Sequence, residues 1–304
     1  MNDRNIKTIS EYHKFRGLPG PKHPLMSLID YSKIDHRTNV EEIVTTPDFY
    51  AIGFKKNIPA KFRYGQSYFD FDEGVMSFFS PNQVIHYEPI KTNFNEQPSG
   101  WLLFIHPDFL WNTTLAKSIQ HFDFFGYAIN EALFLSEDEE KIMAQIFENI
   151  NKEYNSSIDE LSKDIIVAQI ELLLNYAKRF YKRQFITREK NNHEILTKLE
   201  MVLSDYFNQR ETLESGLPSV QFIANQLNVS PNYLSSLLKQ LTGKSTQVHI
   251  HEKLIEKAKE ILSTSSLTVN EIAYELGFER PESFSRLFKK KTNQTPLEFR
   301  ASFN

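Results

Sequence analysis

The segment GFERPESFSRLFKKKTNQTP, residues 277–296, decides the C-terminal part of the fold. A Gly-Phe pair and then Pro281 precede a run of serines, one arginine and three lysines. The run also carries apolar side chains at helical spacing, namely Phe284, Leu287 and Phe288. Proline is favoured at the first position of a helix, because the N–H it lacks would have no helical partner there. The segment therefore predicts a tight turn followed by an amphipathic helix with a basic outer face.

A related segment, NVSPNYLSSLLKQLTGKST, occupies residues 228–246. An Ile-Ala pair precedes each turn, at residues 223–224 and 272–273, and the two segments align from these pairs onward. The alignment needs one extra residue in the second turn. Val229 then aligns with Phe278, and both are expected to fill the turn. An internal repeat is stronger evidence than a single motif. The repeat predicts two helix-turn-helix motifs.

Residues at the ends of these helices support the same interpretation. Ser219 and Ser230 are expected N-caps, since a serine hydroxyl can accept a hydrogen bond from a free helical N–H. Gly243 and Asn293 follow the second helix of each copy, where a left-handed C-terminal cap is expected. Both copies therefore have start and stop signals at the positions that the motif requires.

The outward faces of the two second helices carry residue types that contact DNA. Asn and Arg form bidentate hydrogen bonds with base edges, Ser bonds to bases or phosphates, and Lys neutralises phosphate. A single copy would suit ordinary packed helices equally well, whereas two copies with polar outer faces favour DNA binding. The expected DNA-contacting residues are Asn232, Ser235, Ser236, Lys239, Glu282, Ser285, Arg286, Lys289 and Lys290.

The segment between the two copies is expected to be one helix, from Ser245 to Leu262. Its eighteen residues would span about 27 Å at 1.5 Å per residue. With its flanking turns, this length approaches the helical repeat of DNA, about 34 Å. The second helices of the two copies would then reach successive major grooves on one face of the duplex.

Three strings, residues 223–245, 255–262 and 269–300, resemble the AraC/XylS family of transcription regulators. The resemblance implies a seven-helix DNA-binding domain with two helix-turn-helix units. The sequence departs from the family pattern at Leu238, where Phe is common, and at Asn293, where Gly is usual. It also departs at Leu254, a connector position that is often Arg.

The first 135 residues are rich in short apolar and aromatic runs separated by Gly, Pro and Asn, which predicts strands joined by turns. The runs GVMSFFSPNQVIHYEP, from residue 74, and GWLLFIHPDFL, from residue 100, resemble the cupin-type sensor barrel of the same family. The resemblance implies an effector pocket. Capping signatures at Ser136 and Ser157 predict two helices. The length and wide apolar face of the second suit either packing on the barrel or pairing with another copy of itself.

The predicted fold class is therefore α+β, with a cupin-like β-barrel and two trailing helices before an all-α domain. The expected divisions are a barrel at about 1–135, helices at about 136–185, a polar linker at 186–192 and a DNA-binding domain at 193–304. Residues 1–185 would bind an effector, form a dimer, or both.

Composition limits the alternatives. The 304-residue chain has no cysteine, which excludes a disulfide scaffold, a cysteine-ligated zinc site and a thiol nucleophile. Its net charge of −4 does not favour nucleic acid, but basic residues gather at 176–190 and 280–291. A DNA-binding surface needs a basic patch rather than a basic chain. The polar start and the lack of a long apolar run predict a cytoplasmic protein without a membrane span.

These patterns predict a transcription regulator that binds a specific sequence in double-stranded DNA and is gated by a small-molecule effector. A homodimer and contact with RNA polymerase are also expected. An alternative is a regulator whose barrel serves only dimerisation or protein–protein contact, and the sequence does not separate these two. A further alternative is a cupin-type enzyme fused to a DNA-binding domain.

The enzyme alternative is the weaker one. A metal-dependent cupin needs clustered histidines and a carboxylate, whereas His86, His106 and His121 are scattered. His249 and His251 are two residues apart in a helix and so lie on different faces. The sequence also lacks a nucleophile-elbow or P-loop string. We therefore expect no catalytic residue, no cofactor and no bound metal.

Overall fold

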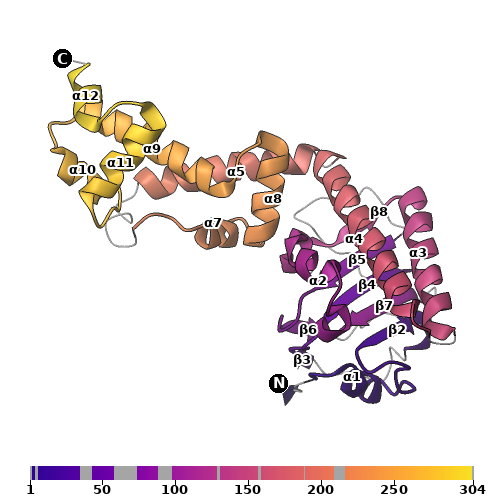
Figure 1. Cartoon of the computed structure of the whole chain (residues 1–304). Coiled ribbons are helices and arrows are strands. Elements are labelled where there is room, and N and C mark those ends of the chain that lie inside the picture. Colours follow the sequence, from indigo (N-terminus) through magenta and orange to yellow (C-terminus); the bar gives the residue numbers. More distant parts are fainter. Residues whose placement is uncertain are drawn as a thin grey trace. The chain divides into compact units, whose positions relative to one another are not determined.

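The computed structural model describes residues 2–3, 6–34, 43–57, 74–87, 98–128, 131–156, 159–187, 189–208 and 216–302 (Figure 1). Contacts divide the chain into two compact units, Met1–Thr187 and Arg188–Asn304. The first contains the strands and the second is built from helices. The predicted order, a strand-rich N-terminal region before a helical C-terminal region, is confirmed.

An antiparallel sheet of five strands forms the centre of the N-terminal unit (Figure 1). In spatial order the strands are β2 (Met26–Asp30), β7 (Ser99–Ile105), β4 (Tyr50–Lys56), β5 (Gly74–Phe79) and β8 (Leu133–Leu135). Ile52 of β4 lies opposite Leu103 of β7 and Phe78 of β5. This register places apolar side chains in rows across the sheet, so the two apolar runs expected to be strands, in β5 and β7, are confirmed as strands.

Both faces of this sheet are covered. On one face, Phe54 stacks on Phe147 of α3 (Glu137–Asn155), with 5.6 Å between ring centroids. On the other, Tyr12 of α1 (Ile9–Phe15) packs edge-on against Phe104, at 4.6 Å. Because side chains alternate along a strand, the apolar residues of β4 and β7 serve both cores.

A smaller sheet consists of β1 (Asn2–Asp3), β3 (Ile43–Thr45) and β6 (Ile85–Tyr87). Strands β1 and β3 are parallel, and β3 and β6 are antiparallel. The described strands thus form two sheets, and the closed cupin-like barrel stays a prediction. Short helices lie between strands: Tyr31–Lys33 follows β2, and four others lie between β7 and β8, namely Pro107–Leu110, α2 (Leu115–Ser118), Ile119–His121 and Asp123–Gly126.

Two long helices follow the sheet, as predicted, and Figure 1 shows α3 and α4 (Ser162–Thr187) lying against it. The capping box at the start of α3 is confirmed, because Ser136 and Glu139 exchange hydrogen bonds. Arg183 of α4 binds the Glu139 carboxylate at 2.6 Å. Gln184 of α4 is buried and accepts a hydrogen bond from the N–H of Phe134 in β8, at 2.8 Å. These bonds fix α4 to both α3 and the sheet.

Helix α4 begins later than expected, at Ser162, and part of the predicted linker is helical. Ser157, the expected cap, lies outside the described residues, and Asp159 instead accepts hydrogen bonds from the N–H groups of Leu161 and Ser162 at 2.8 and 2.9 Å. Helix α4 ends at Thr187 and α5 begins at Glu189, so most of the linker predicted at 186–192 is helical, and the boundary between the two compact units falls within it. This stretch is polar, but it contains no Gly or Pro to end a helix.

The C-terminal unit is helical in its described residues. Its helices are α5 (Glu189–Asn208), α7 (Val220–Gln226), α8 (Pro231–Thr242), α9 (Thr246–Thr264), α10 (Val269–Glu275), α11 (Pro281–Thr292) and α12 (Pro296–Ala301). Helix α9 contacts five of the others, α5, α8, α10, α11 and α12, and so forms the centre of the unit.

None of the helices in the described segments is long and apolar enough to cross a lipid bilayer.

Candidate nucleic-acid interface

The first helix pair consists of α7 and α8. The Ser219 hydroxyl accepts a hydrogen bond from the N–H of Phe222 at 3.0 Å, and the Ser230 hydroxyl accepts one from Tyr233 at 3.2 Å. Both predicted N-caps are therefore confirmed. Helix α8 ends at Gly243, whose φ of 74° is left-handed, as predicted. The inner face of α8 is formed by the buried side chains of Tyr233, Leu234, Leu237 and Leu238.

The second pair, α10 and α11, repeats this construction. Pro281 occupies the first turn of α11, and Asn293 ends the helix with a left-handed φ of 62°. Phe284 and Phe288 form its buried face. Arg280 precedes the helix without a side-chain cap, whereas the first pair has a capping serine there. The two copies thus share their helix boundaries and buried faces but differ at the N-terminus of the second helix.

The turns of the two pairs begin with the same backbone conformation. Asn228 and Gly277 are both left-handed, with φ of 55° and 85°. In each pair the next residue donates its N–H to the carbonyl of the alanine in the preceding helix, at 3.0 and 2.9 Å. These bonds join Val229 to Ala224 and Phe278 to Ala273. The two turns therefore begin with the same geometry, and the second turn then has one more residue before its helix begins at Pro281.

The outward face of α8 is polar and carries little charge. Asn232 and Lys239 are exposed, whereas Ser235 and Ser236 are half-buried. The Ser235 hydroxyl bonds to the hydroxyl of buried Thr246, at 3.1 Å. Ser235 is therefore held by the start of α9, while Asn232 and Lys239 extend into solvent.

The outward face of α11 is strongly basic. Glu282, Arg286, Lys289 and Lys290 are exposed, and Ser285 is half-buried. Within the part of the chain that the structure describes, the cationic members of this set form no hydrogen bond or ion pair. Two lysines of the neighbouring helix α9 are paired instead: Lys253 with Glu256 and Lys257 with Glu260, both at 3.0 Å. The uncompensated positive charge thus gathers on α11.

Helix α9 links the two pairs. Its nineteen residues correspond to about 28 Å. The helix runs from Thr246 to Thr264, with Ser245 at its N-cap, two residues longer at the C-terminal end than predicted. Leu254, where the sequence departs from the family pattern, is fully buried among the helices. That position is therefore part of the core.

The two histidines of α9 have different partners and do not converge on one ion. His249 bonds to the Thr242 hydroxyl at 2.9 Å, and His251 bonds to the Gln247 amide at 3.0 Å. Burial lowers the pKa of His251 below its ordinary 6.5, and the nearby Lys291 and Lys290 lower it further. Burial also lowers the pKa of His249. Across the described residues, no group of three or more His, Cys, Asp or Glu side chains is arranged to hold a metal ion.

Some features of this surface do not follow from the apolar pattern. The left-handed conformation of Asn228 could have been inferred from its alignment with Gly277 in the repeat, since both residue types tolerate positive φ. Arg280 and Lys291 are exposed and extend the basic surface at the two ends of α11. The cluster of basic residues at 280–291 in the sequence could have identified both as part of this surface.

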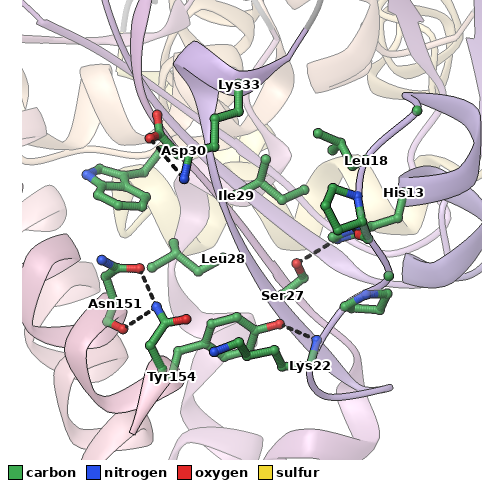
Figure 2. Close-up of a pocket in the computed structure, with 16 residues that line it drawn as sticks. His13, Leu18, Lys22, Ser27, Leu28, Ile29, Asp30, Lys33, Asn151 and Tyr154 are labelled. Carbon is green, nitrogen blue, oxygen red and sulfur yellow. Dashed lines mark hydrogen bonds and ion pairs between the residues drawn. The ribbon is translucent and has the colours of Figure 1, made fainter.

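A cleft of about 420 Å³ lies at the edge strand β2 of the N-terminal unit (Figure 2). Its walls come from the loop at 17–22, from β2 with the neighbouring Trp101, and from the C-terminal part of α3. His13 and Ser27 are both buried and bond to each other at 2.7 Å. On the other side of the cleft, the N–H of Lys22 donates to the Tyr154 hydroxyl at 2.8 Å, which joins the loop to α3.

A protein-family model matches the region from within α7 to the end of α12, which includes both turns and both second helices. Residues 223–302 match a family model described as a helix-turn-helix domain. An uncharacterized HTH-type transcriptional regulator of Pseudoalteromonas carrageenovora is 33% identical over 114 residues, which cover 38% of this chain and 63% of that protein. The HTH-type transcriptional activator RhaS of Escherichia coli O1:K1 is 28% identical over 149 residues, 49% of each chain.

A solved structure from Chromobacterium violaceum, described as a transcriptional regulator with an AraC-type DNA-binding domain, is 24% identical, with a TM-score of 0.31. The match covers 38% of this chain and 96% of that one. The chain spans less than two thirds of the length of either curated relative.

Proposed function

We propose that this chain, which carries an AraC-type helix-turn-helix domain at its C-terminus, regulates transcription by binding a specific sequence in double-stranded DNA. The observation that carries the proposal is the exposed, uncompensated cationic face of α11, placed directly after the turn of a helix pair. Free lysines neutralise phosphates, and an exposed arginine can form a bidentate pair with guanine. A fold alone would not support a function, whereas this surface chemistry does.

In this proposal α8 and α11 are both recognition helices. The support comes from the repeated turn, the equivalent helix boundaries and the length of α9, about 28 Å before its flanking turns are added. Consecutive major grooves on one face of DNA lie about 34 Å apart. A rigid connector of this size lets both helices reach the same face of the duplex.

The two recognition helices would contribute differently. Asn232 lies in the first turn of α8, where its free amide can bond to adenine N6 and N7. Arg286 would read guanine, while Lys289 and Lys290 would contact phosphates. The nearly neutral face of α8 would then supply sequence preference with little electrostatic attraction to DNA. Helix α11 would supply sequence preference and also electrostatic attraction.

Selection of DNA from a random double-stranded library by the full chain tests this proposal. The expected result is an enriched motif with two separate conserved blocks, each lost when the matching helix carries a substitution. Asn232→Ala should reduce sequence conservation in one block of the motif, and Arg286→Ala should reduce it in the other. Recovery of sequences no different from the starting library, with the wild-type chain folded, would rule out sequence-specific binding.

A small-molecule effector is a further part of the proposal, with the cleft at β2 as its candidate site. Trp101 offers an aromatic face, and Asp30 and Asn151 offer hydrogen-bonding groups, the mixed lining that is typical of ligand sites. A ligand that raises the Tm of the wild-type chain but not of the Trp101→Ala variant would support this site. The alternative, an N-terminal unit that serves only dimerisation or protein contact, predicts no such ligand.

The N-terminal unit also presents a surface that suits a homodimer. Leu161, just before α4, and Ile165 and Leu172 on α4 have exposed fractions of 64%, 43% and 44%, and Ala168 is exposed between Ile165 and Leu172. Their spacing of four, three and four residues matches the apolar seam of a coiled coil. Pairing of two such helices would remove these side chains from water. Contact with RNA polymerase is proposed as well, because one relative is named a transcriptional activator.

A further inference from the structure

A close backbone contact connects the two helix pairs at a place away from α9. Gly277, in the turn between α10 and α11, lies against Gly216, three residues before the N-cap of α7. A Cβ atom built on Gly277 would come within 2.7 Å of the carbonyl carbon of Gly216 and 2.8 Å of its oxygen. Both glycines have left-handed φ, 85° and 73°. The segment that leads into the first pair therefore packs on the turn of the second.

Tyr206, near the end of α5, holds this segment in place. Its hydroxyl donates a hydrogen bond to the carbonyl oxygen of Gly216, at 2.9 Å. Its ring packs edge-on against Phe222 of α7, with 5.1 Å between centroids, and the side chain is buried. One tyrosine therefore contacts the first pair directly and, through Gly216, the turn of the second.

The contact also explains why the two copies differ at their turns. The first turn has Asn228 in the left-handed position, and this residue is exposed. Its equivalent in the second turn is Gly277, where the backbone of Gly216 occupies the space that a side chain would need. Asparagine satisfies the φ requirement at both turns, but only glycine satisfies the packing at the second.

We infer that Tyr206 is a positioning residue, which acts through Gly216 and Gly277 to fix the second helix pair relative to the first. It thereby sets the spacing of the two DNA half-sites that the protein accepts. Helix α9 packs against helices of both pairs, and the contact between Gly216 and Gly277 adds a second connection that further restricts their relative movement. This inference rests on the proposed function, because spacing has a meaning only if both α8 and α11 bind DNA.

The test uses the full chain and three versions of the DNA selected by the wild type. The first is intact, the second has one half-site scrambled, and the third has one base pair inserted between the half-sites, a shift of about 3.4 Å. Tyr206→Phe removes the hydrogen bond and keeps the ring. We expect it to weaken binding to the intact site about 3- to 10-fold, as for loss of one hydrogen bond, and to leave the scrambled site unchanged. It should also reduce the ratio of the affinity for the intact site to the affinity for the site with the inserted base pair.

Gly277→Asn provides an independent variant, since asparagine accepts the left-handed φ but its side chain meets the Gly216 backbone. Its matched control is Asn228→Gly, which changes the equivalent residue of the first turn. Gly277→Asn should reduce the preference for correct spacing, whereas Asn228→Gly should keep it. If Tyr206→Phe weakens all three DNAs equally, or leaves the spacing preference intact, the positioning role is wrong.

A measurement without DNA separates this inference from the proposed function. Hydrogen exchange of the full chain should be faster in the peptides around Gly216 and Gly277 when Tyr206 is replaced by Phe. Unchanged exchange in both peptides would overturn the inference even if the wild type binds DNA specifically. A wild type that selects no sequence would instead overturn the proposed function and leave the exchange result to decide whether Tyr206 holds the two pairs together.

Discussion

Arg286 carries the exposed guanidinium on the outer face of α11, without a hydrogen bond or ion pair among the described residues. If it reads a guanine, Arg286→Ala should weaken specific binding by about 1–3 kcal/mol and relax the preference at one base pair. Binding titrations on the selected site and its single-base variants measure both effects. Arg286→Lys is the control that keeps the charge and loses the bidentate geometry. Equal losses on every DNA sequence would assign Arg286 to a phosphate.

Lys290 has a different expected signature, because it is proposed to neutralise a phosphate. Lys290→Ala should lower the slope of log affinity against log salt concentration by about one unit, with little change in sequence preference. Lys141 is the control, since it lies on α3 in the N-terminal unit and pairs with Glu137 at 2.6 Å. Lys141→Ala should leave the slope unchanged. An unchanged slope for Lys290→Ala would place that lysine outside the interface.

For single residues, the sequence predicted the outward positions and the helix caps well but did not predict all hydrogen-bond partners. The outward positions of Asn232 and Arg286 follow from helical periodicity alone. The bond between Ser235 and Thr246 does not, because it joins two helices whose relative rotation is set by core packing. The role of Tyr206 was not predicted either, because its hydroxyl bonds to the backbone carbonyl of Gly216, and every residue has such a group.

Among the elements, the C-terminal end of α8 and the turn between α10 and α11 offer a matched comparison between two glycines. Gly243 and Gly277 are both left-handed, with φ of 74° and 85°, but a Cβ at Gly243 would meet nothing within 4 Å. Gly243→Ala should therefore cost about 1–2 kcal/mol for the left-handed conformation alone. Gly277→Ala carries that cost and also a steric clash with the Gly216 backbone, so its loss should be larger.

Urea unfolding followed by helical circular dichroism measures the difference between these variants. The midpoint of the transition should fall further for Gly277→Ala than for Gly243→Ala. Equal shifts would show that the contact between Gly277 and Gly216 adds nothing to the stability of the unit.

The elements of the C-terminal unit were predictable because each begins and ends with a local signal. Ser230 with Pro231, and later Gly243, mark the limits of α8 within a single window of sequence. The N-terminal sheet is different, since β2 pairs with β7 and joins Met26 to Ile105. Such pairing depends on long-range packing that no local pattern encodes. The linker predicted at 186–192 contains the boundary between the two compact units, and helix is found on both sides of that boundary because no Gly or Pro is present there.

For the whole molecule, the exposed seam of α4 predicts a dimer. Sedimentation of the wild-type chain at micromolar concentration should give twice the mass of one chain. Substituting Ile165 and Leu172 by Glu should give monomers, because it places charges in the seam. Val84→Glu is the control, since Val84 is also exposed, at 54%, but lies away from α4. A wild-type monomer would contradict the proposed pairing.

The distribution of charge also belongs to the whole molecule. The chain is acidic overall, with a net charge of −4, yet α11 carries four cationic side chains against one carboxylate. Affinity for DNA should therefore depend on a local patch, and general attraction to polyanions should be weak. This arrangement favours sequence-dependent contacts over non-specific binding.

A hydroxyl-radical footprint of the full chain on its selected DNA tests the central claim most directly. If α8 and α11 both enter the major groove, two protected segments should appear on one face of the duplex, with centres about 10 base pairs apart. Asn232→Ala should weaken protection of one segment and Arg286→Ala protection of the other. A single protected segment, or uniform protection along the fragment, would contradict binding by two recognition helices.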